Sequence, residues 1–129
     1  MNQSHAYGPA EDRPLTTAEA RLVQWLLERG TVKARCFIPQ LAQARVVSRC
    51  GCGCASIDFS ITGYRGVAQA GMEIPSDYHW RSKGGYLFGV FVFAREGVLA
   101  GLELWSIDGQ STASALPDLE QLRSNDEPY

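Results

Sequence analysis

Apolar residues recur every three or four positions in the segment that follows Pro14, which is the spacing of one face of an α-helix. The stripe consists of Ala18, Leu22, Trp25 and Leu26. Thr16 and Glu19 stand at the start of this stripe with the spacing of a capping box, in which each side chain bonds the other residue's backbone N–H. Gly30 follows the stripe and suits the left-handed conformation of a helix C-cap. The pattern therefore predicts an N-terminal helix that ends near Gly30.

Beyond this helix the apolar and polar residues begin to alternate, as in strands that bury one face. A short second helix is expected from Pro39 to Ala44, because proline suits a first helical turn. The expected strands cover residues 45–49, 55–62, 86–95 and 98–107, with 67–74 and 77–82 as further candidates. A short terminal helix is expected at 117–122. These elements predict an α+β fold, in which two helices pack on an antiparallel meander sheet of four or five strands.

The domain is expected to span residues 15–122, with flexible tails at 1–14 and 123–129. A chain of 129 residues with 45% apolar and 20% charged residues suits one globular domain. Its formal net charge of −2 argues against a surface built for nucleic acid. Neither a signal peptide nor an apolar run of membrane-spanning length is present, so we expect a cytoplasmic protein with reduced cysteines.

The strands at 86–95 and 98–107 are expected to form a hairpin through Glu96-Gly97. Pairing Arg95 with Val98 gives this hairpin two apolar faces, although two helices can cover only one face of the sheet. The second face is predicted either to be wrapped by loops or to contact a partner, including a second copy of the chain. Its residues in this register are Phe88, Val90, Val92, Leu99 and Trp105.

Three of the four cysteines, Cys50, Cys52 and Cys54, alternate with two glycines between the helical and the strand-rich parts of the chain. A hairpin with the loop Gly51-Cys52-Gly53 would make Cys50 and Cys54 cross-strand neighbours and place Val47 opposite Ile57. A straight strand would hold the outer two sulfurs too far apart to share an ion, and a bulged strand is a third arrangement.

The main interpretation is that these cysteines are small apolar side chains that fill the closed end of a hairpin. The alternative is a zinc site, whose ligands would be Cys36, Cys50, Cys52 and Cys54. The C-x-C-x-C spacing differs from the paired C-x2-C knuckles of structural zinc sites, so no cofactor is the main expectation. A redox-active thiol is a further alternative, because Arg45 and Arg49 could stabilise a thiolate.

Other candidate chemistry is sparse. Tyr78, His79 and Trp80 could line a pocket for a small ligand, although aromatic packing in a strand explains the same residues. No serine stands in the G-x-S-x-G pattern of a nucleophile elbow. The residues therefore favour a non-enzymatic interaction or accessory protein, of which a toxin-neutralising or regulatory partner is one version.

The run from Val47 to Phe59, with Cys50-Gly51-Cys52-Gly53-Cys54-Ala55-Ser56 at its centre, resembles a group of small bacterial proteins with a C-G-C-x-S hairpin. These proteins also have an N-terminal helix and a late G-x-L-x-x-L-E strand, which is similar to Gly97–Glu103 here. The resemblance covers residues 15–122 and implies a bacterial, cytoplasmic, single-domain protein. The group has no established activity, so the resemblance implies no catalytic residue.

Overall fold

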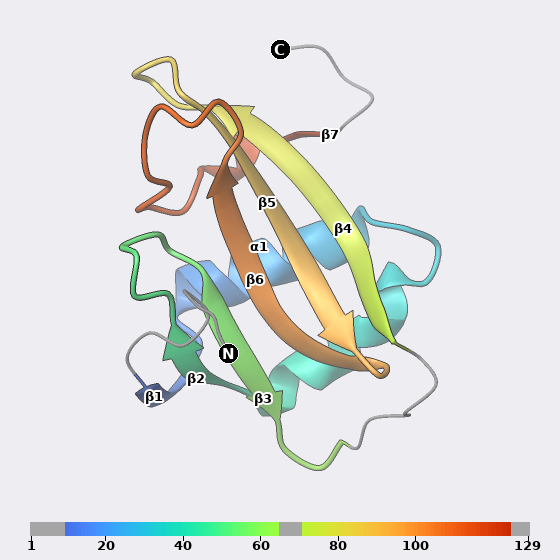
Figure 1. Ribbon diagram of the computed structural model, residues 1–129. Coiled ribbons are helices and arrows are strands. Elements are labelled where there is room, and N and C mark those ends of the chain that lie inside the picture. Colours follow the sequence, from blue (N-terminus) through green and yellow to red (C-terminus); the bar gives the residue numbers. More distant parts are fainter. Residues whose placement is uncertain (1–9, 65–70, 125–129) are drawn as a thin grey trace.

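The computed structural model describes residues 10–64 and 71–124. The chain forms an α+β fold, in which one α-helix and one 3-10 helix pack on an antiparallel sheet (Figure 1). The helical elements are α1 (Thr17–Glu28), η2 (Ala34–Gln43) and η3 (Leu119–Gln121). The strands are β1 (Ala10–Pro14), β2 (Ala44–Arg49), β3 (Ile57–Ile61), β4 (Met72–Arg81), β5 (Leu87–Arg95), β6 (Val98–Ser106) and β7 (Arg123–Ser124). The predicted fold class is therefore confirmed at the level of α+β.

The sheet has seven strands within the described residues, in the order β1-β2-β3-β6-β5-β4-β7. The predicted count of four or five strands is wrong, and so is the simple meander. β3 pairs with β6, where Ile57 lies opposite Leu102, and β4 follows β5 further along the sheet. The candidate strand at 77–82 lies in β4 except for its last residue. Half of the candidate at 67–74 lies outside the described residues, and 72–74 belong to β4.

The two additional edge strands come from segments predicted as tails. β1 pairs with β2, and its carboxylates bond arginines of that strand: Asp12 accepts from Arg45 at 2.9 Å and Glu11 accepts from Arg49 at 3.0 Å. β7 pairs with the middle of β4. Short polar strands at a sheet edge carry little hydrophobic pattern, so alternation alone does not reveal them. The rest of the predicted tails lies outside the described residues.

Helix α1 begins as predicted. Thr16 Oγ1 accepts from the Glu19 N–H at 3.0 Å, and Glu19 Oε1 accepts from the Thr16 N–H at 2.9 Å. The predicted role of Gly30 is wrong, because its backbone is not in the left-handed conformation. A Cβ at Gly30 would overlap the Pro75 carbonyl and Ala34, and the adjacent Thr31 N–H donates to Pro75 O at 2.8 Å. Glycine is needed here because α1 ends against β4.

Both α1 and η2 lie on the same face of the sheet, behind it in Figure 1. α1 contacts β4 and β5, and η2 contacts β3 and β6. The second helix is longer than predicted and is of the 3-10 type, with Pro39 inside it. The fully buried side chains between the layers are mostly aliphatic. The largest are Leu22, Leu26, Leu27, Leu99, Leu102 and Leu104.

The β5–β6 hairpin turns at Glu96-Gly97 and pairs Arg95 with Val98, as predicted. The register shifts between Phe93 and Ala94, so that Phe93 faces Gly101 and Gly89 faces Trp105. The predicted partner surface therefore mixed two faces. Phe88, Val90, Val92 and Leu99 are buried in the core. Trp105 is 44% exposed and lies on the helix-free face, where it lines a groove with Phe91 and Phe93. A one-residue bulge places every later side chain of the strand on the opposite face of the sheet.

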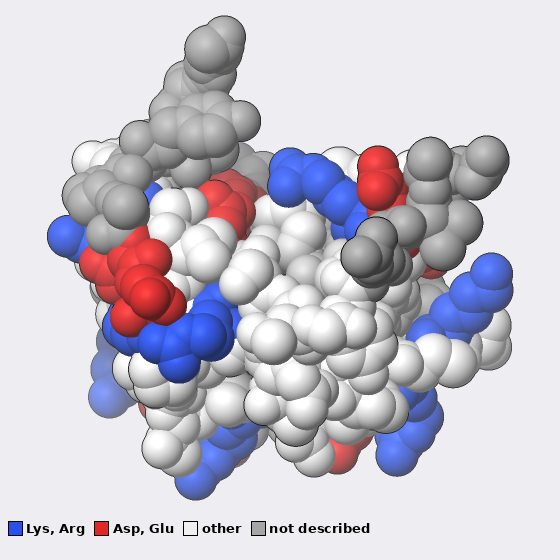
Figure 2. Space-filling view, turned by 90° about the horizontal axis from the view of Figure 1, so that it is seen from below, with Lys and Arg blue, Asp and Glu red and all other residues white. Residues whose placement is uncertain are grey.

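Figure 2 views the end of the molecule that lies lowest in Figure 1. Uncharged side chains fill the middle of this face, and basic and acidic side chains are interspersed around it. No helix within residues 10–64 and 71–124 is long and apolar enough to cross a membrane.

Candidate thiol site

The three clustered cysteines lie in the turn between β2 and β3. The turn is closed by a hydrogen bond from the Cys50 N–H to the Ser56 carbonyl, at 3.1 Å. Ser56 is buried, and its Oγ donates to Leu104 O at 3.1 Å and accepts from the Leu104 N–H at 2.8 Å. Gly53 has a φ of 99°, a backbone conformation that residues other than glycine rarely adopt. The turn is thereby held at the sheet while its tip bends back.

This turn brings three sulfur atoms together. The Sγ atoms of Cys50, Cys52 and Cys54 all lie within 4.8 Å of one another. Cys50 and Cys52 are joined by a disulfide, and the Sγ atoms of Cys52 and Cys54 are 3.2 Å apart. The Cys54 thiol donates to Ser56 Oγ at 3.2 Å. The cluster therefore contains one disulfide and one further thiol within van der Waals reach of it, whereas the sequence led us to expect reduced cysteines.

Backbone amides point at two of the sulfurs. The Cys52 N–H donates to Cys50 Sγ at 3.3 Å, and the Cys54 N–H donates to Cys52 Sγ at 3.5 Å. A hydrogen bond to a charged atom favours the charged form, so these amides would stabilise thiolates once the disulfide is reduced.

The predicted geometry of the turn is wrong in two respects. Arg49, and not Val47, lies opposite Ile57, because the β2–β3 register shifts between Val46 and Ser48. Residues 50–56 therefore form the turn, and the predicted three-residue loop does not occur. Cys36 lies on η2 with its side chain exposed and is not in the sulfur cluster, so the predicted four-cysteine zinc site is not assembled.

Two arginines lie beside the cluster. Arg13 and Arg49 line a cavity of about 300 Å³ together with Cys54. Both are bound by Glu11: the hydrogen bond from Arg13, followed by that from Arg49, lowers the pKa of the Glu11 carboxyl below its ordinary value. Arg13 also bonds Glu19 at 2.9 Å, which with Glu11 raises the pKa of the guanidinium. This network keeps two guanidinium groups on the Cys54 side of the turn.

A groove of about 370 Å³ on the helix-free face begins at Cys50. Its floor is aromatic, because glycines on neighbouring strands leave space for flat rings. A Cβ at Gly89 would overlap the indole of Trp105, and a Cβ at Gly101 would lie 2.6 Å from the Phe93 ring. The other lining residues include Met72, Phe91, Arg95 and Glu103. The cysteine cluster thus lies between this groove and the arginine-lined cavity.

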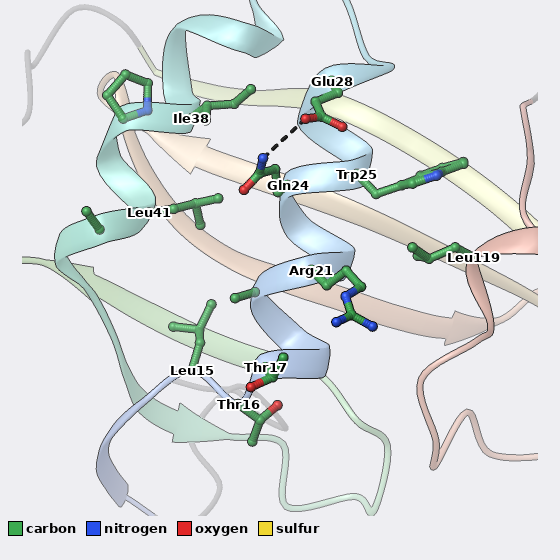
Figure 3. A pocket seen from close by; sticks show the side chains of 13 residues that line it. Leu15, Thr16, Thr17, Arg21, Gln24, Trp25, Glu28, Ile38, Leu41 and Leu119 are labelled. Atoms are coloured by element: carbon green, nitrogen blue, oxygen red, sulfur yellow. Dashed lines mark hydrogen bonds between the residues drawn. The ribbon is translucent and has the colours of Figure 1, made fainter.

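A larger groove, with a volume of about 780 Å³, lies elsewhere, between α1 and η2. Figure 3 shows Ile38 and Leu41 pointing from η2 toward α1, and Gln24 on α1 bonded to Glu28 at 3.2 Å. Its lining is mostly apolar and includes no cysteine or histidine. We therefore place the candidate chemistry at the smaller cysteine site, where reactive groups converge.

Tyr78, His79 and Trp80 do not form the predicted ligand pocket. They are consecutive in β4, so their side chains point alternately to opposite faces. Tyr78 Oη donates to the Arg29 carbonyl at 3.1 Å beneath α1, and Trp80 packs on Phe88 in the core. His79 is buried and lies opposite Gly89. The aromatic-packing interpretation of this segment is therefore the one that the structure favours.

Ser56 is the serine of the C-G-C-x-S motif, but sequence reasoning assigned it no role. Its hydroxyl anchors the turn to β6 and accepts from the Cys54 thiol. Its position two residues beyond Cys54 continues the alternation of the cysteines. Its partner Leu104 is 48 residues away in the sequence, and no local pattern predicts that pairing.

Comparison with protein-family models, with curated proteins and with solved structures finds no match to this chain. The resemblance to small bacterial proteins with a C-G-C-x-S hairpin therefore stays a prediction. The same holds for a protein partner, self-association and a cytoplasmic location.

Proposed function

We propose that the protein, in its reduced form, binds one thiophilic metal ion through Cys50, Cys52 and Cys54. The observation that carries the proposal is that the three Sγ atoms lie within 4.8 Å of one another on one short turn. Around an ion with metal–sulfur bonds of about 2.3 Å, neighbouring sulfurs lie about 3.7–4.0 Å apart. Opening the disulfide and a small relaxation of the turn would give that spacing.

Two further features support a thiolate site. Amide N–H groups of Cys52 and Cys54 already bond sulfur, which lowers the cost of charging it. The two hydrogen bonds of Ser56 with Leu104 fix the turn on the sheet, so little ordering is left to the ion.

Three thiolate ligands suit two thiophilic ions, zinc and copper(I). Zinc would take a fourth ligand from outside the cluster, because it is usually tetrahedral. Copper(I) is a softer ion for which thiolate ligands are selective. Cys52 is exposed and Cys54 half-buried, so the site has an open side for an external ligand. Zinc is the ion we propose first, and copper(I) is the second arm of the test.

The experiment is a titration of the fully reduced protein with zinc, in competition with a chelator of known affinity. We expect one ion per chain. Each of the variants Cys50→Ser, Cys52→Ser and Cys54→Ser should lower the affinity at least about tenfold, because each removes one of three ligands. A parallel titration with copper(I) under anaerobic conditions shows which ion the site prefers.

Cys36→Ser is the matched control, because it makes the same chemical change at an exposed cysteine outside the cluster. It should bind metal as the unchanged protein does. The far-ultraviolet circular dichroism spectrum of each variant checks that the fold is retained. The proposal is overturned if neither ion binds, or if Cys36→Ser weakens binding as much as the three cluster variants do.

A further inference from the structure

We propose that the cysteine turn is a redox-gated metal site, in which formation of the Cys50–Cys52 disulfide expels the ion. This inference rests on the metal-binding function proposed above and adds its regulation. The disulfide uses two of the three sulfurs that the ion would need. A disulfide sulfur is no longer a thiolate, and the thiolate is the form that binds metal. The ion and the disulfide therefore exclude each other.

The exposure of the three cysteines sets the order of the reaction. Cys52 is exposed and Cys54 half-buried, whereas Cys50 is only 5% exposed. A disulfide in solution can thus reach the sulfur of Cys52 before that of Cys50. Once Cys52 has reacted, Cys50 and Cys54 are the two thiols close enough to attack it. In the structure the disulfide joins Cys52 to Cys50, whereas the Cys54 thiol is hydrogen-bonded to Ser56 Oγ.

The exchange balances with a small-molecule disulfide as oxidant. The Cys52 thiolate attacks one sulfur of the oxidant, forms a mixed disulfide and releases one small thiolate. The Cys50 thiolate then attacks Cys52 Sγ and releases the second small thiolate. Two protein thiolates have lost two electrons, the oxidant has gained two, and the ion leaves because Cys54 is its only remaining cluster ligand. Excess small thiol reverses both steps.

The test uses the full chain in three arms. The first measures zinc binding by the reduced protein. The second adds glutathione disulfide to the zinc-loaded protein and follows the released zinc with a coloured chelator, while mass spectrometry follows the loss of two hydrogens per disulfide. The third titrates the thiols of the oxidised, unfolded protein. We expect one zinc released per disulfide formed, and two remaining thiols, those of Cys36 and Cys54.

The variants separate the roles of the three sulfurs. Cys54→Ser keeps both sulfurs of the disulfide and should form it at a rate similar to that of the unchanged protein. Cys52→Ser removes the exposed sulfur and should slow intramolecular disulfide formation at least about tenfold, since the reaction depends on access to the attacking thiol. Cys36→Ser should release zinc as the unchanged protein does.

The outcomes separate this inference from the proposed function. If the first arm shows no zinc binding, the metal-binding function fails and the gating fails with it. If zinc binds, the gating alone is overturned when the oxidised protein retains zinc with undiminished affinity. It is also overturned if the disulfide forms between other cysteines. Support requires that oxidation lowers the affinity at least about 100-fold and that excess dithiothreitol restores it.

Discussion

The two faces of the sheet are built from the same strands but differ in what covers them. The face under α1 and η2 is mostly aliphatic and closed, with Leu104 only 1% exposed. The opposite face has aromatic rings laid over glycines, an open groove and the cysteine turn at one end. Adjacent residues on one strand, such as Leu104 and Trp105, therefore belong to different environments. The comparison indicates that stability depends mainly on one face and chemistry on the other.

The largest effect should come from the covered face. Leu104→Ala removes a fully buried side chain and should lower the free energy of unfolding by about 2–5 kcal/mol. Met72→Ala, at a position that is 57% exposed on the open face, should change it by about 0.5 kcal/mol or less. Urea unfolding followed by circular dichroism measures both. Similar losses for the two variants would contradict the division between the faces.

Two glycines on the open face should differ in their tolerance of a methyl group. A Cβ at Gly101 would lie 2.7 Å from the backbone carbonyl of Ile57, which cannot move without disturbing β3. Gly101→Ala should therefore destabilise by about 1–3 kcal/mol. The three atoms nearest to a Cβ at Gly89 all belong to the side chain of Trp105, which is 44% exposed and can turn away. We expect Gly89→Ala to lower the free energy of unfolding by less than Gly101→Ala does in the same assay. The reverse order would refute this explanation.

The capping box should contribute less than the core. Thr16→Ala removes the acceptor for the Glu19 N–H and should cost about 1 kcal/mol in thermal or urea unfolding. Thr17→Ala, one residue further and also exposed, is the control and should have little effect. Equal losses of stability for Thr16→Ala and Thr17→Ala would contradict this role of the cap.

The smallest effect is the acid dependence contributed by Glu19. Burial acts to raise the pKa of its carboxyl, but the hydrogen bonds from Arg13 and Thr16 together outweigh burial, and the pKa falls below the ordinary 4.5. A lowered pKa in the folded state adds stability above the unfolded-state pKa, and this stability is lost as the pH falls through the folded-state pKa. Unfolding measured from pH 6 to pH 3 should therefore show a weaker pH dependence for Glu19→Gln. An unchanged slope would rule out this contribution.

Local signals predicted the elements that local contacts determine. Thr16 and Glu19 lie three residues apart and fixed the start of α1, and Glu96-Gly97 fixed the β5–β6 turn. The sulfur cluster is also local: the sequence marked Cys50, Cys52 and Cys54 as a group, but left open whether a hairpin, a straight strand or a bulge holds them. It wrongly added Cys36, because only the tertiary fold decides where η2 places that side chain.

The remaining features depend on contacts between distant segments. The pairing of β3 with β6, which replaced the predicted meander, joins Ile57 to Leu102. The bulge beside Phe93 moved Trp105 to the open face, and no residue in the hairpin signals that extra position. β1 is held by ion pairs between carboxylates and arginines of β2, which a hydrophobic pattern cannot show. The sequence shows which residues are apolar but not which strands pair in the sheet.

The central claim is that three cysteine sulfurs of one turn hold one metal ion. X-ray absorption spectroscopy of the reduced, zinc-loaded protein at one ion per chain tests it most directly, because it counts the sulfur neighbours of the ion. The account predicts three sulfur ligands at about 2.3 Å, and one lighter ligand. The same spectrum is expected from Cys36→Ser. A shell made mainly of nitrogen and oxygen, or a sulfur count that falls when Cys36 is replaced, would contradict the account.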